Sequence, residues 1–416
     1  MSSIATVPRS IATLVERFDG EAFDARGPVR IRIALGEGEA WDVLVADGSA
    51  VIGPPGSRPD ALLAGDAKAW REIAADVRAG MRAFRSGRLS VRRNVHLGIG
   101  FLAATSGATG PGRLRFRTVA SAGARCSLVE AGVGPTAVAL HGLGATKASF
   151  LTTVAALSGQ FRVIALDLPG FGDSDKPIGA AYDAQYFAEA VLGVLDALEL
   201  KRVHLIGNSL GGRVALEVAL RQPRRVSRLA LLAPSLAWRR ERPARLLVRL
   251  SRPELGLVQL APRPVVKGIV ERLVPGADEG WTAAGVDEFL RAYLTRSGRA
   301  AFYAAARHIY LEEPHGKDGF WTRLRALRAD ALFVWGRRDR LVPIAFERHV
   351  ADALPRARHL ELDCGHVPQV ERPRETHAAL AGFLSGSSGR TLVARRALRA
   401  ERAARLSARA DAARAS

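Results

Sequence analysis

The segment RVHLIGNSLGGRVALEVALR (202–221) constrains the fold of this chain more than any other. Its first half is an apolar run of strand length, and its second half has the apolar spacing of a helix. Ser209 stands at the junction, with Gly207 two residues before it and Gly211 two residues after it. Glycine weakens strands and helices alike, so this arrangement predicts a sharp strand-to-helix turn with no room for side chains beside the serine.

Short apolar runs repeat along the chain on both sides of this segment. They are TAVALHG (136–142), FRVIALD (161–167), VSRLALLAP (226–234), ADALFVWG (329–336) and RHLELDCG (358–365). Amphipathic helices such as 184–198 separate most of them, and LRFRTVA with ARCSLVEAG predicts an antiparallel pair at the start. The alternation predicts an α/β fold with a doubly wound, mostly parallel sheet over residues 114–388.

Two intervals depart from this alternation. Residues 235–325 are helical and rich in arginine, and they lie between two core strands, which predicts an inserted helical cap. SGATGPGR lies within the predicted linker 106–113, because small and flexible residues dominate it. Residues 1–105 are therefore expected to form a separate small α+β domain, and residues 389–416 a basic tail.

The predicted N-terminal domain has its own pattern of elements. VRIRIAL (29–35) alternates with period two, and AWDVLVADGSAVIG (40–53) predicts two strands joined by an Asp-Gly turn. Asp66 is the expected N-cap of a helix whose apolar face includes Trp70, Ile73 and Val77. A short helix, the strand-like RLSVR and a second apolar helix complete the region.

The stretches ADGSAVIG, PDALLAGDAKAWREI and AFRSGRLSVRRNVHLG make this domain resemble a sterol carrier protein type-2 domain. The resemblance is a pattern of spaced apolar positions and turns that covers about 100 residues. It implies a curved mixed sheet under helices, an apolar tunnel for a sterol or acyl chain, and no catalytic residues. The alternative is that the apolar residues only fill the domain's own core.

Two polar side chains follow later strands of the predicted sheet. Asp339 comes just after ALFVWG, and His366 comes just after LELDCG. Ligand sites of α/β proteins gather at the carboxyl edge of a parallel sheet, where both residues and Ser209 are expected. A serine hydroxyl is a weak nucleophile that needs a base held in place by an acid, so the three residues together predict nucleophilic catalysis.

The phrases GNSLGG, WGRRDRLVP, GHVPQVERP and DLPGFGDSDKP make residues 114–386 resemble the α/β-hydrolase superfamily. In that family the nucleophile, acid and base follow in this order. The resemblance therefore implies Ser209 as nucleophile in a G-x-S-x-G elbow, Asp339 as acid and His366 as base. It also implies an oxyanion hole formed by the backbone amides of Leu210 and Leu143.

Other polar residues near these phrases are given no chemical role. His141 is interpreted as a structural loop residue, and Asp167, Asp173 and Asp175 as residues that shape a neighbouring loop. Cys364, two residues before His366, is expected to be packed at a strand end. The sequence has no metal-ligand spacing, P-loop or dinucleotide fingerprint, so neither a metal nor a cofactor is expected.

Serine at the elbow favours acyl transfer to water through an acyl-enzyme. The leading interpretation is a serine hydrolase of hydrophobic esters or thioesters, with a lipid-binding N-terminal domain. One alternative is hydrolysis of a carbon–carbon bond in vinylogous 1,3-diketones that arise by ring cleavage. Another is a lipid-binding or transfer protein in which the hydrolase half is only a scaffold. A hydrophobic small molecule or lipid is the expected substrate.

About half of the net charge of +20 lies in 238–254 and 390–416, where the positive residues are arginines. No zinc finger, aromatic-basic strand motif or basic zipper accompanies it, so nucleic acid is not an expected partner. These segments are compatible with peripheral contact with an anionic membrane, and equally with ordinary solvated helices. With two distant cysteines, no long apolar segment and no signal-peptide core, the chain is expected to be cytoplasmic.

Overall fold

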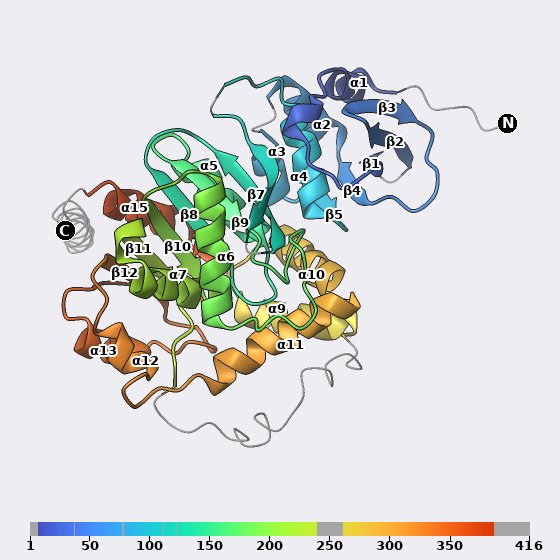
Figure 1. Cartoon of the computed structure of the whole chain (residues 1–416). Helices are drawn as coiled ribbons and strands as arrows, with labels where there is room; N and C mark the ends of the chain where they lie inside the picture. The colour runs from blue at the N-terminus through green and yellow to red at the C-terminus, as the bar shows by residue number, and fades with distance from the viewer. Residues whose placement is uncertain are drawn as a thin grey trace, which may run out of the picture.

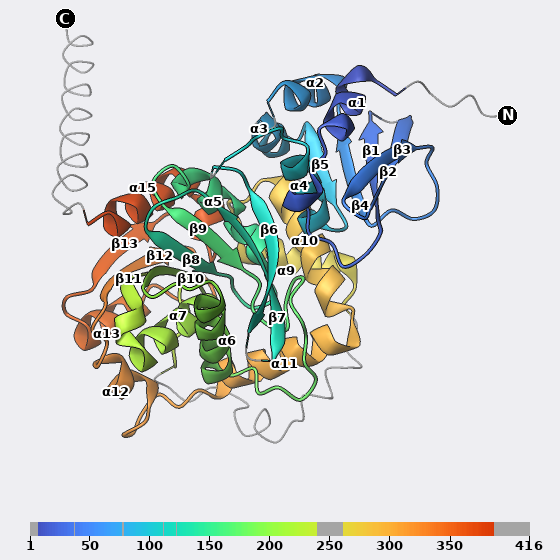
Figure 2. The same ribbon diagram turned by 45° about the horizontal axis from the view of Figure 1, so that its top comes forward.

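A computed structural model of the chain describes residues 7–36, 38–76, 79–110, 112–121, 123–238 and 261–386. The expected contribution of Val77 to a helix face, the arginine-rich segment 239–260 and the tail 389–416 lie outside these residues. The described part contains two β-sheets, one in the N-terminal hundred residues and a larger one after residue 114, as Figures 1 and 2 show.

The N-terminal domain is a mixed five-stranded sheet with the strand order β3-β2-β1-β4-β5. Strands β1 and β4 are parallel and the other neighbours are antiparallel. Its elements are α1 (Arg9–Glu16), η1 (Gly20–Ala22), β1 (Val29–Leu35), β2 (Glu39–Ala46), β3 (Ser49–Gly53), β4 (Ala61–Gly65), α2 (Ala67–Ala75), α3 (Ala79–Arg85), β5 (Leu89–Arg92) and α4 (Val95–Ala104). The predicted hairpin and helices are present.

Local sequence explains these elements. Asp47 and Gly48 both have positive φ, 47° and 75°, as the tight turn between β2 and β3 requires. The side chain of Asp66 accepts a hydrogen bond from the amide of Ala69 and caps α2 as predicted. Strand β4 was not predicted, because its sequence ALLAG runs without a break into the helical pattern that follows.

The larger sheet has eight strands in the order β13-β12-β11-β10-β8-β9-β7-β6. The predicted antiparallel pair β6–β7 lies at one edge, β7 is antiparallel to β9, and all other neighbours are parallel. The strands are β6 (Arg115–Ser121), β7 (Ala124–Ala131), β8 (Thr136–Leu140), β9 (Arg162–Leu166), β10 (Val203–Asn208), β11 (Val226–Leu232), β12 (Asp330–Gly336) and β13 (Arg358–Leu362). The predicted mostly parallel α/β sheet is confirmed.

Helices cover both faces of this sheet because successive side chains of a buried strand point to opposite faces. On β8, Val138 and Leu140 pack toward one apolar cluster, while Ala137 and Ala139 pack toward another. The elements between and after the strands are η2 (Lys147–Phe150), α5 (Leu151–Leu157), α6 (Ala184–Ala197), α7 (Leu210–Arg221), η3 (Pro223–Arg225), α12 (Phe320–Leu324), α13 (Phe346–Ala353), α14 (Pro368–Glu371) and α15 (Pro373–Leu384).

The described part of the predicted cap interval is helical. It contains α9 (Arg263–Leu273), α10 (Glu279–Tyr293) and α11 (Arg296–Leu311), between β11 and β12. Side chains of Asp278 and Thr295 cap the N-termini of α10 and α11, which explains where these two helices begin. Figures 1 and 2 show α10 beside the N-terminal domain.

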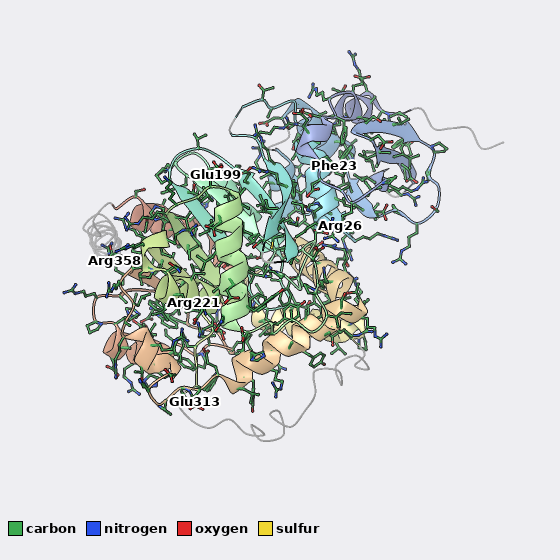
Figure 3. All side chains as sticks on the ribbon, viewed as in Figure 1. Phe23, Arg26, Glu199, Arg221, Glu313 and Arg358 are labelled. Atoms are coloured by element: carbon green, nitrogen blue, oxygen red, sulfur yellow. The ribbon has the colours of Figure 1, made fainter. Side chains whose placement is uncertain are left out.

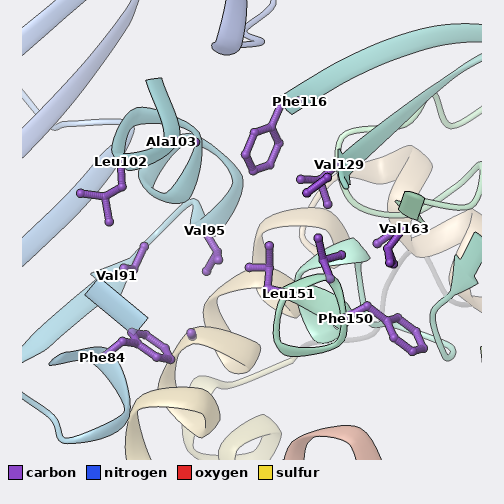
Figure 4. Packing of buried hydrophobic residues seen from close by; sticks show 14 of the residues in the cluster. Phe84, Val91, Val95, Leu102, Ala103, Phe116, Val129, Phe150, Leu151 and Val163 are labelled. Atoms are coloured by element: carbon purple, nitrogen blue, oxygen red, sulfur yellow. The ribbon is translucent and has the colours of Figure 1, made fainter. Parts of the chain in front are cut away.

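The N-terminal domain and the larger sheet share one apolar cluster. It extends from Ile11 of α1 through Phe101 of α4 to Leu380 of α15. Figure 4 shows Phe116 of β6 between Ala103 of α4 and Val129 of β7. Because this interface is a continuous core, the two sheets form one packed unit. No helix among the described residues is long and apolar enough to cross a membrane.

Candidate active site

Ser209 lies at the junction between β10 and α7, as the sequence predicts. Its backbone has φ 52° and ψ −116°, a conformation that non-glycine residues rarely adopt. A Cβ atom at Gly207 would collide with the carbonyl of Gly211, and one at Gly211 would collide with the carbonyl of Leu140. The turn therefore excludes side chains at both positions, which explains the glycines around the serine.

The predicted oxyanion donors lie on either side of Ser209. Leu210 is the first residue of α7, where backbone amides have no partner within the helix and the helix dipole favours negative charge. Gly142, the neighbour of Leu143, approaches so closely that its Cβ would lie 3.2 Å from Cβ of Ser209. The loop after β8 and the start of α7 therefore both adjoin the serine.

Asp339 and His366 form a buried pair. Oδ2 of Asp339 lies 2.7 Å from Nδ1 of His366. Oδ1 accepts hydrogen bonds from the amides of Leu341 and Val342, which orient the carboxylate. Asn208, beside Ser209, donates a hydrogen bond to the carbonyl of His366 over 3.0 Å. Residues that are far apart in the sequence thus meet at the carboxyl ends of the strands.

Glu371 holds the loop that carries His366, and sequence reasoning assigned it no role. Its carboxylate accepts hydrogen bonds from the amides of Gly365 and Val367, on both sides of the histidine. It also accepts one from the amide of Gly276, which follows α9. The signal was present in the phrase GHVPQVERP, but the spacing alone does not reveal which backbone groups the carboxylate binds.

The structure agrees with the interpretation of His141 and Cys364 as structural residues. Nε2 of His141 accepts a hydrogen bond from the amide of Leu168, so the proton lies on Nδ1, which donates to the carbonyl of Gly142. Burial lowers the pKa of His141. Cys364 is fully buried, and burial raises the pKa of its thiol to about 12. Neither side chain is available as a second base or nucleophile.

The loop aspartates form ion pairs. Nζ of Lys147 lies 2.6 Å from Asp167 and 3.1 Å from Asp173, and all three have buried or nearly buried charged groups. Burial is the largest single influence and would raise the pKa of both carboxyl groups, but Lys147 together with the other neighbouring groups outweighs it, so the pKa of each is lowered. Asp175 pairs with Arg125 and with Arg26 of the N-terminal domain. Figure 3 labels Arg26 where the two domains meet.

Aromatic side chains of the cap lie over the loop that contains Leu143. A Cβ atom at Gly144 would lie 2.9 Å from the ring of Phe289 on α10 and 3.1 Å from the ring of Phe302 on α11. Tyr293 stacks on Phe289, with ring centroids 4.9 Å apart. These rings form an apolar roof, defined here as Phe289, Tyr293 and Phe302, beside the predicted oxyanion donor.

A cavity of about 570 Å³ adjoins the loop that carries Asp339. Its lining residues are Arg272, Pro275, Arg337, Arg338, Asp339 and Arg340. Arg337 and Arg338 pair with the exposed carboxylates of Glu361 and Asp363. Two of the four arginines that line this cavity therefore have carboxylate partners, and the lining includes neither Ser209 nor His366.

Comparisons with known proteins agree with this geometry. A family model described as the alpha/beta hydrolase fold matches residues 135–373. The 2-hydroxymuconate semialdehyde hydrolase of Pseudomonas sp. (strain CF600) is 29% identical over 294 residues, which are 65% of this chain and 93% of that protein. The 2-hydroxy-6-oxononadienedioate/2-hydroxy-6-oxononatrienedioate hydrolase of Paraburkholderia phymatum is 30% identical over 60% of this chain and 86% of its own length.

Solved structures show the same architecture. A membrane phospholipase A has a TM-score of 0.56 and 30% identity, covering 66% of this chain and 86% of its own. The enol-lactonase from Burkholderia xenovorans LB400, with a TM-score of 0.52, covers 65% of this chain and all of its own, but its 24% identity shows the fold alone.

The family model does not include the N-terminal domain, and the comparisons give the sterol carrier resemblance no support. The structure contains the small α+β domain, but its identity as a lipid carrier stays a prediction. For the larger part of the chain, the eight-stranded sheet, the elbow at Ser209 and the family match over more than half of the 416 residues lead to one conclusion. The chain belongs to the α/β-hydrolase fold family.

Proposed function

We propose that this chain is a serine hydrolase in which Ser209 attacks a carbonyl carbon, His366 removes the proton from the serine hydroxyl, and Asp339 orients His366. The amides of Leu143 and Leu210 would stabilise the oxyanion. The observation that carries the proposal is the 2.7 Å contact between Asp339 and His366 beside a serine elbow with positive φ. Water activated by His366 then releases the acyl group from the enzyme.

For the substrate we propose first a ring-cleavage product, a vinylogous 1,3-diketone that carries a carboxylate. The two curated relatives are named as hydrolases of 2-hydroxymuconate semialdehyde and of 2-hydroxy-6-oxononadienedioate or 2-hydroxy-6-oxononatrienedioate, which are conjugated hydroxy-oxo carboxylates. Attack at the ketone breaks the adjacent carbon–carbon bond, and its electron pair moves into the conjugated system. The cavity beside Asp339 is lined by neither Ser209 nor His366, so this proposal rests on the relatives and not on that cavity. The sequence alone favoured ester hydrolysis, but the named relatives support carbon–carbon bond hydrolysis better.

A carboxylic ester is the second candidate. It is favoured by the likeness to a phospholipase A and by the apolar roof over Gly144. The chemistry at Ser209 is the same, because an alcohol leaves the tetrahedral intermediate in place of a carbon group. A hydrophobic or lipid substrate and contact with an anionic membrane belong to this candidate and stay predictions.

The two candidates are separated by steady-state kinetics of the purified full-length chain. A 2-hydroxy-6-oxo-dienoate, followed by the loss of its visible absorbance, is compared with p-nitrophenyl esters from acetate to dodecanoate. A higher kcat/KM for the dienoate supports carbon–carbon hydrolysis, and a higher value for a long-chain ester supports the ester candidate. A chain that turns over neither substrate and does not react with a fluorophosphonate contradicts the proposed function as a whole.

A further inference from the structure

Helix α10 of the cap contacts the N-terminal domain along one face. Trp281 packs edge-on against Phe84 of α3, with ring centroids 5.1 Å apart. Ala284, one turn later, belongs to the apolar cluster that contains the core of the N-terminal domain. Asp287 and Glu288 follow after another turn, and both are buried. Residues at this spacing share one face of a helix, so α10 presents a continuous surface to the N-terminal domain.

The acidic end of this surface binds the turn between β5 and α4. Asp287 accepts a hydrogen bond of 2.6 Å from Nε of Arg92 and one of 3.0 Å from the amide of Arg93. Arg93 has φ 70°, so the turn holds an uncommon conformation that directs its amide at the cap. Burial is the largest single influence and would raise the pKa of Asp287, but Arg92, the amide of Arg93 and Arg263 together outweigh it and lower the pKa.

Glu288 touches three parts of the molecule. Oε1 accepts a 2.7 Å hydrogen bond from the amide of Val95, the first residue of α4. Oε2 accepts bonds from Arg291 over 2.9 Å and from the hydroxyl of Thr146 over 3.5 Å. Thr146 lies three residues after Leu143, in the loop of the predicted oxyanion hole. A carboxylate at a helix N-terminus is electrostatically favourable, and here the cap supplies it to a helix of another domain.

Arg291, one turn further along α10, continues this contact into the hydrolase loops. It binds Asp173 over 2.7 Å and 3.2 Å, and Asp173 in turn binds Lys147 of the same loop as Thr146. Nδ1 of His96 on α4 lies 3.5 Å from the same Asp173 carboxylate. The N-terminal domain, the cap and the loop after β8 therefore meet in one largely buried cluster of polar and charged groups.

The consequence for the active site follows from the residue next to Glu288. Phe289 contacts the Gly144 region of the same loop and forms part of the apolar roof. Because Phe289 is adjacent to Glu288 on α10, a shift of the helix backbone at Glu288 moves the ring as well. The contacts of Asp287 and Glu288 with the N-terminal domain thus determine where the apolar roof lies relative to the loop that contains Leu143.

We infer that Glu288 is a positioning residue through which the N-terminal domain fixes the aromatic roof and the oxyanion loop of the active site. In this chain the N-terminal domain then serves as part of the substrate site, whether or not it binds a lipid. The inference rests on the proposed function only for the statement that the site under the roof binds substrate.

The test uses full-length Glu288→Gln, which keeps the shape of the side chain and removes its charge. The matched control is Glu72→Gln, which alters a partly exposed pair with Arg88 inside the N-terminal domain. Loss of a buried charge-assisted hydrogen bond corresponds to roughly tenfold or more in an equilibrium. We expect KM for the better of the two proposed substrates to rise by about tenfold because the roof is displaced, and kcat to fall because the oxyanion loop shifts. The Glu72→Gln control should keep both constants.

Hydrogen exchange gives a second readout that does not depend on catalysis. In Glu288→Gln the amides of 142–147 and 280–293 should exchange faster, while those in the β10–α7 turn should not change. Asp287→Asn serves as a second variant with the same expected direction if Glu288→Gln does not fold. Unchanged KM and unchanged exchange in the folded variant, or equal effects in Glu72→Gln, would overturn the inference. Failure of wild type to react with a fluorophosphonate contradicts the proposed function instead. The exchange result then still decides whether Glu288 links the N-terminal domain to the loop after β8.

Discussion

The carboxylate of Asp339 is held so that only one of its oxygens is left for His366. Oδ1 accepts hydrogen bonds from the amides of Leu341 and Val342, and Oδ2 lies 2.7 Å from Nδ1 of His366. Because a carboxylate oxygen can only accept, its contact with Nδ1 selects the tautomer of His366 with its proton on Nδ1. Nε2 is then free to accept a proton.

This geometry predicts the effect of Asp339→Asn. The oxygen of the new amide must remain with the two backbone donors, so its NH₂ group faces Nδ1 and drives the imidazole proton to Nε2. A histidine in that tautomer cannot act as the base, and kcat should fall by about 10⁴-fold. Substrate turnover measured beside urea unfolding checks this. A fall of less than about tenfold with normal stability would contradict the assigned role of Asp339.

Replacement of the nucleophile provides the most direct test of the proposed chemistry. Ser209→Ala should abolish labelling by a fluorophosphonate and lower kcat by on the order of 10⁴-fold or more, because the acyl-enzyme can no longer form. Labelling is read by gel fluorescence and mass spectrometry. The exposed Ser385→Ala variant is the control, and label that persists in Ser209→Ala would place the nucleophile elsewhere.

Glu371→Gln should weaken the loop that carries His366. The charged carboxylate accepts three backbone hydrogen bonds, and its replacement by an amide leaves at least one amide donor without an acceptor, at a cost of about 1–3 kcal/mol. We expect a lower kcat with KM nearly unchanged, since the base and not the substrate site is displaced. Kinetics and urea unfolding are compared with Glu361→Gln, which alters a surface pair with Arg337. Equal behaviour of the two variants would count against a positioning role.

Two glycines should respond to alanine in opposite ways. Gly211→Ala places a methyl group against the carbonyl of Leu140 and should destabilise the fold by at least about 3 kcal/mol, or prevent folding. Gly268→Ala on α9 meets no atom within 4 Å and should stabilise by about 0.5–1 kcal/mol through helix propensity. Thermal and urea unfolding measure both. A neutral Gly211→Ala would refute the steric account of the elbow.

Buried imidazoles predict the pH dependence of stability. Burial lowers the pKa of His96 and His141, and lowers that of His204 to about 4. In the unfolded chain each of these imidazoles takes up a proton below the ordinary histidine pKa of about 6.5. In the folded chain the same imidazole stays neutral to a lower pH. Stability is therefore fully present above about pH 6.5 and is lost as the pH falls toward the lowered pKa values, by up to about 1.4 kcal/mol per pH unit for each group.

His204→Leu isolates one of these groups. Nδ1 of His204 is buried and has no hydrogen-bond partner among the described residues, so leucine leaves no donor unsatisfied in its place. Urea unfolding between pH 7.5 and pH 5 should show a shallower loss of stability than in wild type. The exposed His315→Gln variant is the control. An unchanged slope in His204→Leu would mean that His204 does not contribute to this pH dependence.

Local sequence patterns were sufficient to predict most helices and strands, and the candidate residues at the carboxyl ends of the strands. Short apolar runs predicted the strands of the large sheet and a period-two run predicted β1, while Asp66 predicted a helix start and the glycines around Ser209 predicted the turn. The side chains of Asp339 and His366 were predicted because parallel strands bring their carboxyl ends to one edge. Each inference needed only a short stretch and a rule about strand or helix geometry. Strand β4 was not predicted, because its apolar run continues without a break into the helical pattern of α2.

The sequence by itself thus determined the α/β architecture and the three residues proposed for catalysis. Only the tertiary structure revealed that Glu371 binds the backbone around His366, and that Glu288 joins α4, Thr146 and Arg291. Each of these carboxylates joins its own segment to a distant one, Glu371 to Gly276 and Glu288 to Val95 and Thr146. No spacing rule encodes such contacts, because packing of the N-terminal domain against the cap decides which groups a buried charge can reach.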